Sequence, residues 1–357
     1  MRGPVVWRWW ASRGVLLLGV LVLAALHPPL SPAAAAALFL VESFPQSPIK
    51  PLAWLAPPPA HHPIALSSPN GPVVGDLFVP GTRLIPPPRR PAVIVGTGVR
   101  LDREQDRAAV RHLAASLARL GYVTLWPRLE AIDAGGWQFE RPDTFVRAFG
   151  YLAARDDVDP ERISLLGISL GASIVLVAAS EPAIAEQVHT VIFLGGYFDL
   201  LDYILAIVNE RAPYAGGDIP WRAGDDTRRQ ARELVQAEGL GQLRPYVETE
   251  APLESRDALI ALLSPDDLAR LYRLSPAAQI ERLRAPVFIL HDRHDEYVPF
   301  TESEKLAAAL PAGTPRSLLI SSAFDHVNLG QEPSLELVVE FARLYGFLVG
   351  VFAALPA

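Results

Sequence analysis

Short apolar runs alternate with segments of helical periodicity from residue 64 to the end of the chain. This alternation is typical of a mostly parallel sheet with helices on both faces. Most of the runs are too apolar for half-exposed antiparallel strands and fit buried parallel ones. The pattern predicts strands at 72–79, 92–96, 121–126, 162–167, 190–195, 286–291 and 316–321. Apolar stripes predict sheet-covering helices at 104–120 and 142–155.

One connection is much longer than the others. Residues 199–283 separate the predicted strand 190–195 from the strand 286–291, whereas a connection in such a sheet normally takes only a few residues. The segment consists of amphipathic helical stretches separated by prolines. It predicts a helical cap over one edge of the sheet, inserted before the penultimate strand.

A candidate nucleophile lies directly after the predicted strand 162–167. Residues 167–171 read Gly-Ile-Ser-Leu-Gly and precede an apolar helical segment. A G-x-S-x-G string is weak evidence alone, but a strand before it and a helix after it are what a nucleophile elbow requires. The two glycines allow the tight turn, Ser169 stands at its tip, and the backbone N–H of Leu170 faces the charge that develops on an attacked carbonyl oxygen.

A neutral serine hydroxyl is a poor nucleophile, so this interpretation requires a histidine base and a carboxylate that orients it, in the chain order Ser, Asp, His. Both residue types follow predicted strands. The sequence reads HDRHDEYVP around the end of strand 286–291 and SSAFDHVN after strand 316–321. These loops supply candidate acids and the candidate base His326.

With these motifs the chain resembles the α/β-hydrolase superfamily over roughly residues 64–350, nearest to its dienelactone-hydrolase-like and prolyl-peptidase-like branches. The resemblance implies an α/β-hydrolase fold with a Ser-Asp-His catalytic triad. In the family's G-x-x-D-x-x-V-P loop, Asp295 takes the acid position, and His326 takes the position of the base that follows the last strand. Ser169 is the nucleophile in this resemblance.

Two positions depart from the family pattern. The family usually carries His-Gly after the third strand, but the sequence reads Gly-Thr-Gly-Val at 96–99. The backbone N–H of Val99, together with that of Leu170, is therefore our expected oxyanion hole. Asp292 occupies the position of the family's loop glycine and is a second candidate acid. Asp199, at the end of another strand, is a third.

Composition excludes several other chemistries. The chain contains no Cys, which excludes disulfides, a thiolate nucleophile, iron–sulfur clusters and Cys-ligated zinc. Its formal charge of -7 has the wrong sign for a protein that neutralises nucleic-acid phosphates. The His and Asp side chains of 291–295 are of types that ligate zinc, but closely spaced residues leaving a strand diverge. We expect no metal and no organic cofactor.

The N-terminus has the form of an export signal. Residues 1–13 carry three arginines and no acidic residue, and 14–26 carry no charge. A retained anchor is our expectation, because 33–41 continues the apolar stretch so that 14–41 is long enough to cross a bilayer. The alternatives are cleavage near 33–37 and an apolar helix packed on the domain. With an anchor or a cleaved signal, the catalytic domain lies outside the cytoplasm.

Prolines are concentrated before residue 91, and the segment 42–63 is expected to be an extended spacer. The predicted organisation is a signal or anchor at 1–41, a Pro-rich linker at 42–63, a hydrolase domain at 64–198 and 284–357, and a cap at 199–283. The predicted function is a serine hydrolase that cleaves an ester, thioester or amide of a small-molecule acyl substrate. The alternatives are an acyltransferase with the same triad and a non-catalytic, membrane-tethered scaffold.

Overall fold

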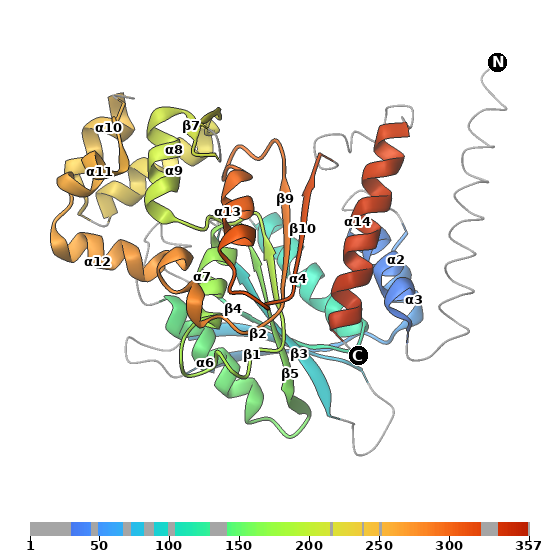
Figure 1. The fold of residues 1–357 in the computed structure, drawn as a ribbon. Helices are drawn as coiled ribbons and strands as arrows, with labels where there is room; N and C mark the ends of the chain where they lie inside the picture. The colour runs from blue at the N-terminus through green and yellow to red at the C-terminus, as the bar shows by residue number, and fades with distance from the viewer. Residues whose placement is uncertain are drawn as a thin grey trace.

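An eight-stranded sheet forms the centre of the molecule, in the order β1-β2-β4-β3-β5-β6-β9-β10 (Figure 1). The computed structural model describes residues 30–43, 49–66, 73–81, 89–98, 104–128, 141–214, 217–237, 239–249, 252–322 and 335–355. The strands are β1 (Ala60–Leu66), β2 (Val73–Val79), β3 (Arg90–Thr97), β4 (Val123–Pro127), β5 (Val158–Ile168), β6 (Val191–Leu194), β9 (Val287–Asp292) and β10 (Arg316–Ser321). From β4 to β10 the neighbouring strands pair in parallel, while β1 and β2 pair antiparallel. All seven predicted strands are present, and the predicted mostly parallel sheet is confirmed.

Helices cover both faces of this sheet. Successive side chains of β3 alternate between the faces: Ile94 is buried against α6 and α7, whereas Val93 and Val95 are buried against α4, α14 and α2. The covering helices are α2 (Pro32–Ser43), α3 (Pro51–Leu55), α4 (Glu104–Arg119), α6 (Arg141–Ala153), α7 (Leu170–Ala179), α13 (Thr301–Ala309) and α14 (Leu335–Ala354). The two helices predicted from apolar stripes correspond to α4 and α6. A strand apolar on both faces is therefore buried on both.

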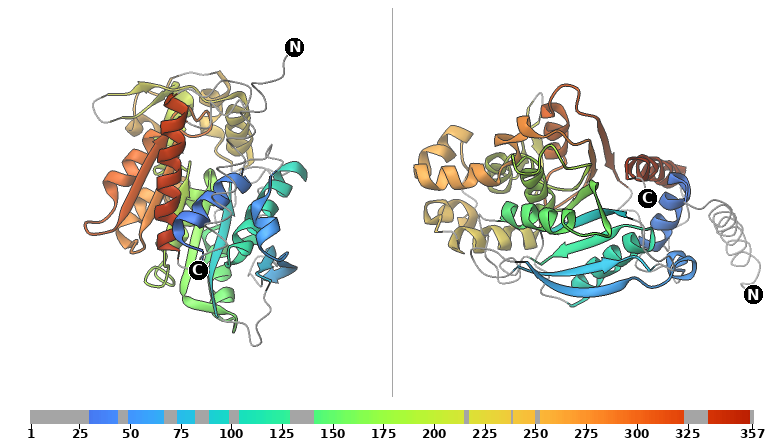
Figure 2. Two further views of the ribbon diagram at one scale, coloured as in Figure 1. Left: turned by 90° about the vertical axis from the view of Figure 1, so that its right-hand side faces the viewer. Right: turned by 90° about the horizontal axis from the view of Figure 1, so that it is seen from below.

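The predicted helical cap lies between β6 and β9. Figures 1 and 2 show its helices together on one side of the sheet, opposite α14 and α2. It contains α8 (Leu200–Asn209), the strand pair β7 (Arg211–Ala212) and β8 (Ile219–Pro220), α9 (Asp225–Ala237), the 3₁₀ turn η1 (Gly241–Leu243), α10 (Arg244–Thr249), α11 (Arg256–Leu262) and α12 (Pro265–Leu274). Side-chain oxygens of Asp199, Ser255 and Ser264 cap the N-termini of α8, α11 and α12. These N-terminal capping residues and Pro265 define where α8, α11 and α12 begin.

The segment 42–63 differs from the expected extended spacer. It contains α3, and β1 begins at Ala60 and pairs along its whole length with β2. Proline permits both elements, because Pro51 occupies the first turn of α3 and Pro63 lies on an edge strand. Proline content therefore did not prevent this segment from joining the fold.

Residues 33–41 also differ from the expected continuation of a membrane span. They belong to α2, which lies beside α14 (Figure 2) and buries Ala36 and Leu38 in the core. The carboxylate of Glu42, at the end of α2, accepts a hydrogen bond from the N–H of Leu52 at 3.0 Å. Within the described residues, no helix is long and apolar enough to span a bilayer. Residues 1–29, which hold the predicted signal, lie outside the described residues.

Candidate active site

Ser169 stands on a sharp turn between β5 and α7. Its backbone has φ 56° and ψ −137°, a combination that is strained for a residue with a side chain and that persists only where the surroundings hold it. Its N–H donates to the Leu194 carbonyl at the end of β6 (2.7 Å), and its carbonyl accepts from the Ala172 N–H (2.8 Å). The backbone conformation is that of a nucleophile elbow.

Close backbone packing holds this turn. A Cβ on Gly171 would lie 2.6 Å from the carbonyl carbon of Thr97, and a Cβ on Gly167 would overlap the Cα of Ala172. Gly98 packs in the same way against Gly171. The loop that follows β3 therefore lies directly against the start of α7, where the first N–H groups of a helix have no partner within the helix. Of the expected oxyanion donors, Leu170 occupies this position, and Val99 lies outside the described residues.

Asp295 lies in the loop after β9. Its Oδ1 accepts hydrogen bonds from the N–H groups of Tyr297 (2.6 Å) and Val298 (3.1 Å). Its Oδ2 lies 3.4 Å from the position that a Cβ on Gly195 would take. Because Gly195 follows the residue that bonds the Ser169 N–H, Asp295 and Ser169 both adjoin the carboxyl end of β6.

The buried side chain of His291 contacts the loop that carries Asp295, residues 293–300, which we call the acid loop. His291 Nδ1 lies 2.6 Å from Ser303 Oγ, and its Nε2 lies 2.9 Å from the Val298 carbonyl and 3.4 Å from Asp295 Oδ2. The sequence pattern indicated no role for His291 other than that of a possible metal ligand. Among the described residues, no group of three or more His, Cys, Asp or Glu could hold a metal ion. The hydrogen bonds of His291 instead stabilise the loop that carries Asp295.

The other two candidate acids take part in local structure. Asp292 Oδ1 accepts a hydrogen bond from the His294 N–H (2.9 Å) within the turn after β9. Asp199 caps α8, and its Oδ2 forms an ion pair with Arg256 of α11 at 2.9 Å. The candidate base His326 falls in 323–334, outside the described residues, so its pairing with any of these carboxylates stays a prediction.

Side chains of the cap bind the backbone of the acid loop. Trp221 Nε1–H donates to the Asp295 carbonyl (2.7 Å), Thr227 Oγ1–H to that of Glu296 (3.1 Å), and Tyr203 Oη–H to that of Tyr297 (2.8 Å). Burial and the nearby charge of Asp295 raise the pKa of Tyr203, so its hydroxyl remains a donor. Sequence reasoning missed these bonds, because nothing local connects cap residues with a loop about 70–95 positions away.

The two ends of the cap meet over the N-terminus of α13. The buried Glu302 carboxylate accepts hydrogen bonds from the N–H groups of Phe198 (2.9 Å) and Asp199 (2.8 Å), where the cap begins. Ser275 Oγ, where α12 ends, accepts from the Leu200 N–H (3.1 Å). Burial raises the pKa of Glu302, although the adjacent ammonium group of Lys305 opposes this effect. The cap is thus attached to the hydrolase core by backbone hydrogen bonds to buried side chains.

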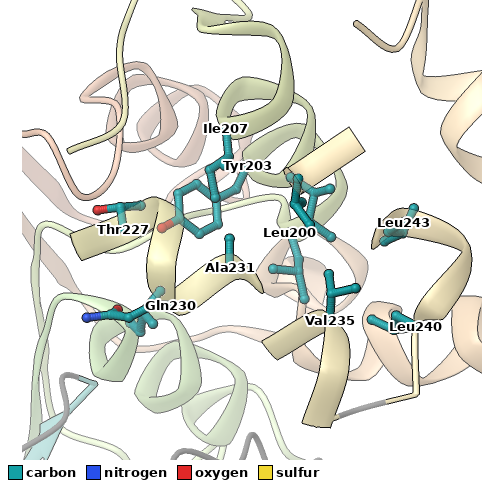
Figure 3. A pocket seen from close by; sticks show the side chains of 12 residues that line it. Leu200, Tyr203, Ile207, Thr227, Gln230, Ala231, Val235, Leu240 and Leu243 are labelled. Carbon is teal, nitrogen blue, oxygen red and sulfur yellow. The ribbon is translucent and has the colours of Figure 1, made fainter. Parts of the chain in front are cut away.

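An apolar cavity of about 30 Å³ lies within the cap (Figure 3), beside the side chain of Leu170. The side chain of Leu170 forms its wall on the elbow side, and α8, α9, η1 and α10 form the rest. The lining residues from these elements and the segments between them are Leu200, Tyr203, Ile204, Ile207, Thr227, Gln230, Ala231, Val235, Leu240, Leu243 and Val247. The residue after the candidate nucleophile therefore connects the elbow to the interior of the cap.

Comparison with protein families identifies the family of this chain. Residues 135–332, more than half of it, match the model of the alpha/beta hydrolase fold family. The chain belongs to this family. Among curated proteins it is similar to the acyltransferase drtE of Aspergillus calidoustus, with 26% identity over 211 residues that cover 56% of this chain and 68% of that protein.

Solved structures of peptidases are similar to this chain. Dipeptidyl peptidase 4 of Porphyromonas gingivalis superposes with a TM-score of 0.51 at 14% identity, over 82% of this chain and 36% of that chain. The acylaminoacyl peptidase of Pyrococcus horikoshii gives 0.47 at 15% identity, over 74% and 37%. The chain thus spans little more than a third of the length of these peptidases. The likeness to dipeptidyl peptidase 4 agrees, at the level of the fold, with the prolyl-peptidase-like resemblance.

Proposed function

We propose that this protein is a serine hydrolase that cleaves carboxylic esters through an acyl-enzyme on Ser169. The observation that carries the proposal is the strained backbone of Ser169 at the start of α7, held by neighbouring backbone that leaves no room for side chains at 167 and 171. A neutral structural serine gains nothing from such a conformation. A nucleophile gains an exposed hydroxyl beside the first N–H groups of a helix.

The proposed reaction has two halves. His326 removes the proton from Ser169 Oγ as this oxygen attacks the carbonyl carbon, and the N–H groups of Leu170 and Val99 bind the oxyanion. The C–O bond to the leaving alcohol then breaks, and the alcohol receives the proton from His326. In the second half, water loses a proton to His326 and attacks the acyl carbon, the bond to Ser169 Oγ breaks as this oxygen takes the proton back from His326, and the carboxylic acid is released.

Asp295 is our proposed acid, which holds the imidazole of His326 in its productive orientation. Its support is its place beside the end of β6 and the hydrogen bonds that fix its loop on both sides. Asp199 is a weaker candidate, because its carboxylate already caps α8 and pairs with Arg256. Asp292 is the stronger of the two alternative candidate acids.

Acyl transfer is the second candidate function. The similarity to the acyltransferase drtE and the apolar cavity beside Leu170 favour it, because transfer requires that an acceptor alcohol or amine outcompete water at the acyl-enzyme. The chemistry at Ser169 is the same for both functions. The ratio of hydrolysis to transfer in the presence of added acceptor alcohols separates them, and a dominant transfer product would replace hydrolase with acyltransferase.

The test of the nucleophile uses a fluorophosphonate probe and intact mass. We expect a single adduct on the wild-type protein that is absent in Ser169→Ala and at least 100-fold slower in His326→Ala. Of Asp295→Asn, Asp292→Asn and Asp199→Asn, only the first should slow labelling strongly. Equal labelling of Ser169→Ala would overturn the proposal. A folded wild-type protein that neither labels nor turns over esters would support the non-catalytic scaffold.

We also propose that the protein is exported, with its catalytic domain outside the cytoplasm. The support is the arginine-rich start of the chain and the uncharged segment 14–26 that follows it. Intact mass of the protein recovered from membrane and soluble fractions distinguishes a retained anchor from a cleaved signal. Full-length protein in the cytosol alone would contradict export.

A further inference from the structure

We propose that the cavity within the cap binds the short, unbranched aliphatic acyl chain of the substrate, and that Ala231 and Leu243 set the chain length it accepts. This inference rests on the proposed function, because it assigns the acyl side of the ester that Ser169 attacks. It goes beyond that function by naming the substrate class and the residues that select it.

Leu170 relates the cavity to the elbow, because its backbone belongs to the elbow and its side chain to the cavity wall. The N–H of Leu170 begins α7 beside Ser169, and its side chain lines the cavity. The same side chain is buried in the core of the cap, with Tyr203 and Leu243. The cavity therefore adjoins the residue next to Ser169, and the proposed acyl chain reaches it past the Leu170 side chain.

The chemistry of the lining selects an apolar group. Among the described residues that line the cavity none is charged, and most are Leu, Ile or Val. Two of the polar ones use their hydroxyl groups elsewhere: Tyr203 bonds the Tyr297 carbonyl and Thr227 the Glu296 carbonyl. Figure 3 shows the amide of Gln230 pointing away from Ala231. A charged or polar acyl group would lose its hydration here without gaining partners.

The size of the cavity limits the chain. Its volume of about 30 Å³ corresponds to roughly two waters at 10–15 Å³ each, so a short chain fits with small side-chain shifts and a long one requires the cap helices to separate. Ala231 of α9 has the smallest side chain of the lining and lies between Tyr203 and Val235 (Figure 3). Leu243 closes the side formed by η1. A larger side chain at Ala231 would fill the cavity, and a smaller one at Leu243 would extend it.

The experiment measures kcat/KM of the full-length protein on p-nitrophenyl esters from acetate to dodecanoate. We expect about a fourfold rise per added methylene up to butanoate and a fall beyond it, because the cavity holds roughly two or three carbons. Ala231→Phe should move the optimum to acetate, and Leu243→Ala should move it to longer chains. The matched controls Ala261→Phe on α11 and Leu318→Ala on β10 change exposed side chains outside the cavity lining and should leave the optimum at butanoate. An unchanged optimum in Ala231→Phe, or the same shift in its control, would overturn the proposal.

A second measurement does not depend on turnover. Butanoate should raise the melting temperature of the wild-type and Ser169→Ala proteins more than acetate does, and this difference should disappear in Ala231→Phe. If Ser169 fails to label and esters are not cleaved, but the butanoate effect follows this pattern, the catalytic proposal is wrong and the binding site stands. If esters are cleaved but butanoate and acetate act alike, the cavity is not the acyl site.

Discussion

The elbow and the cap are built in different ways. At the elbow, backbone packs on backbone, so that even a methyl group on Gly171 would meet the main chain of Thr97. In the cap, Gly241 has no atom within 4 Å of the position its Cβ would take, and the contacts with the acid loop come mainly from side chains such as Trp221 and Thr227. The elbow therefore tolerates almost no change, while the cap can change its side chains and keep its helices. Under the proposed function, the elbow carries the chemistry and the cap selects the substrate.

The acid loop joins the two regions. His291 and Ser303 support it from the hydrolase core, and Trp221, Thr227 and Tyr203 bind its backbone from the cap. Two of these cap residues, Thr227 and Tyr203, also line the cavity. A change in the cap can therefore affect both the choice of substrate and the position of the candidate acid.

We expect the largest difference between the elbow and the cap when a methyl group is added to one glycine in each. Gly171→Ala should lower the free energy of unfolding by about 3 kcal/mol and abolish fluorophosphonate labelling, because its Cβ meets backbone that cannot rotate away. Gly241→Ala in the cap should change stability by less than about 0.5 kcal/mol. Denaturant unfolding of both variants measures the difference, and equal effects would remove the contrast.

A smaller effect is expected from the bond between the two regions. Trp221→Phe removes the donor to the Asp295 carbonyl and should lower the free energy of unfolding by about 1 kcal/mol. It should also lower kcat several-fold, because the loop that carries the candidate acid is held less firmly. Trp54→Phe, on the exposed side chain of α3, is the matched control. A loss of stability without a change in kcat would mean that Trp221 serves only packing.

The smallest effect concerns the charges at the base of the cap. Although burial raises the pKa of Asp202, the hydrogen bonds and charges of Lys305 and Arg256 outweigh it and hold that pKa below its ordinary value. A lowered native pKa stabilises the fold above the unfolded pKa of about 3.9 and loses that contribution as pH falls through the native pKa.

Asp202→Asn should therefore cost about 1 kcal/mol near neutral pH, and its difference from the wild type should shrink below about pH 4. Glu302, whose raised pKa acts in the opposite direction, shares Lys305 with Asp202, so the comparison is made in the wild-type and Glu302→Gln backgrounds to isolate the contribution of Asp202. Asp226→Asn, which breaks an exposed pair with Arg229 within α9, should have almost no effect. A difference that stays constant with pH would contradict the ionic origin.

The strands, the elbow and the insertion of the cap could be predicted because each has a local signal. Burial on both faces makes a parallel strand apolar throughout, and the elbow requires small residues at 167 and 171 within a few positions of Ser169. The segments 33–41 and 42–63 gave no such signal. Prolines suggested a spacer where β1 pairs with β2, and an apolar run suggested a membrane span where α2 packs on α14.

By itself the sequence determined the class of fold, the cap's place in the chain and the candidate nucleophile, since these depend on residues that are neighbours along the chain. Only the tertiary structure decided which surface the apolar segment 33–41 covers, that His291 supports Asp295, and that Leu170 connects the elbow with an apolar cavity. An apolar or polar side chain has the same sequence signature whether its partner is lipid, metal or another part of the chain. Its partner is fixed only when distant segments pack together.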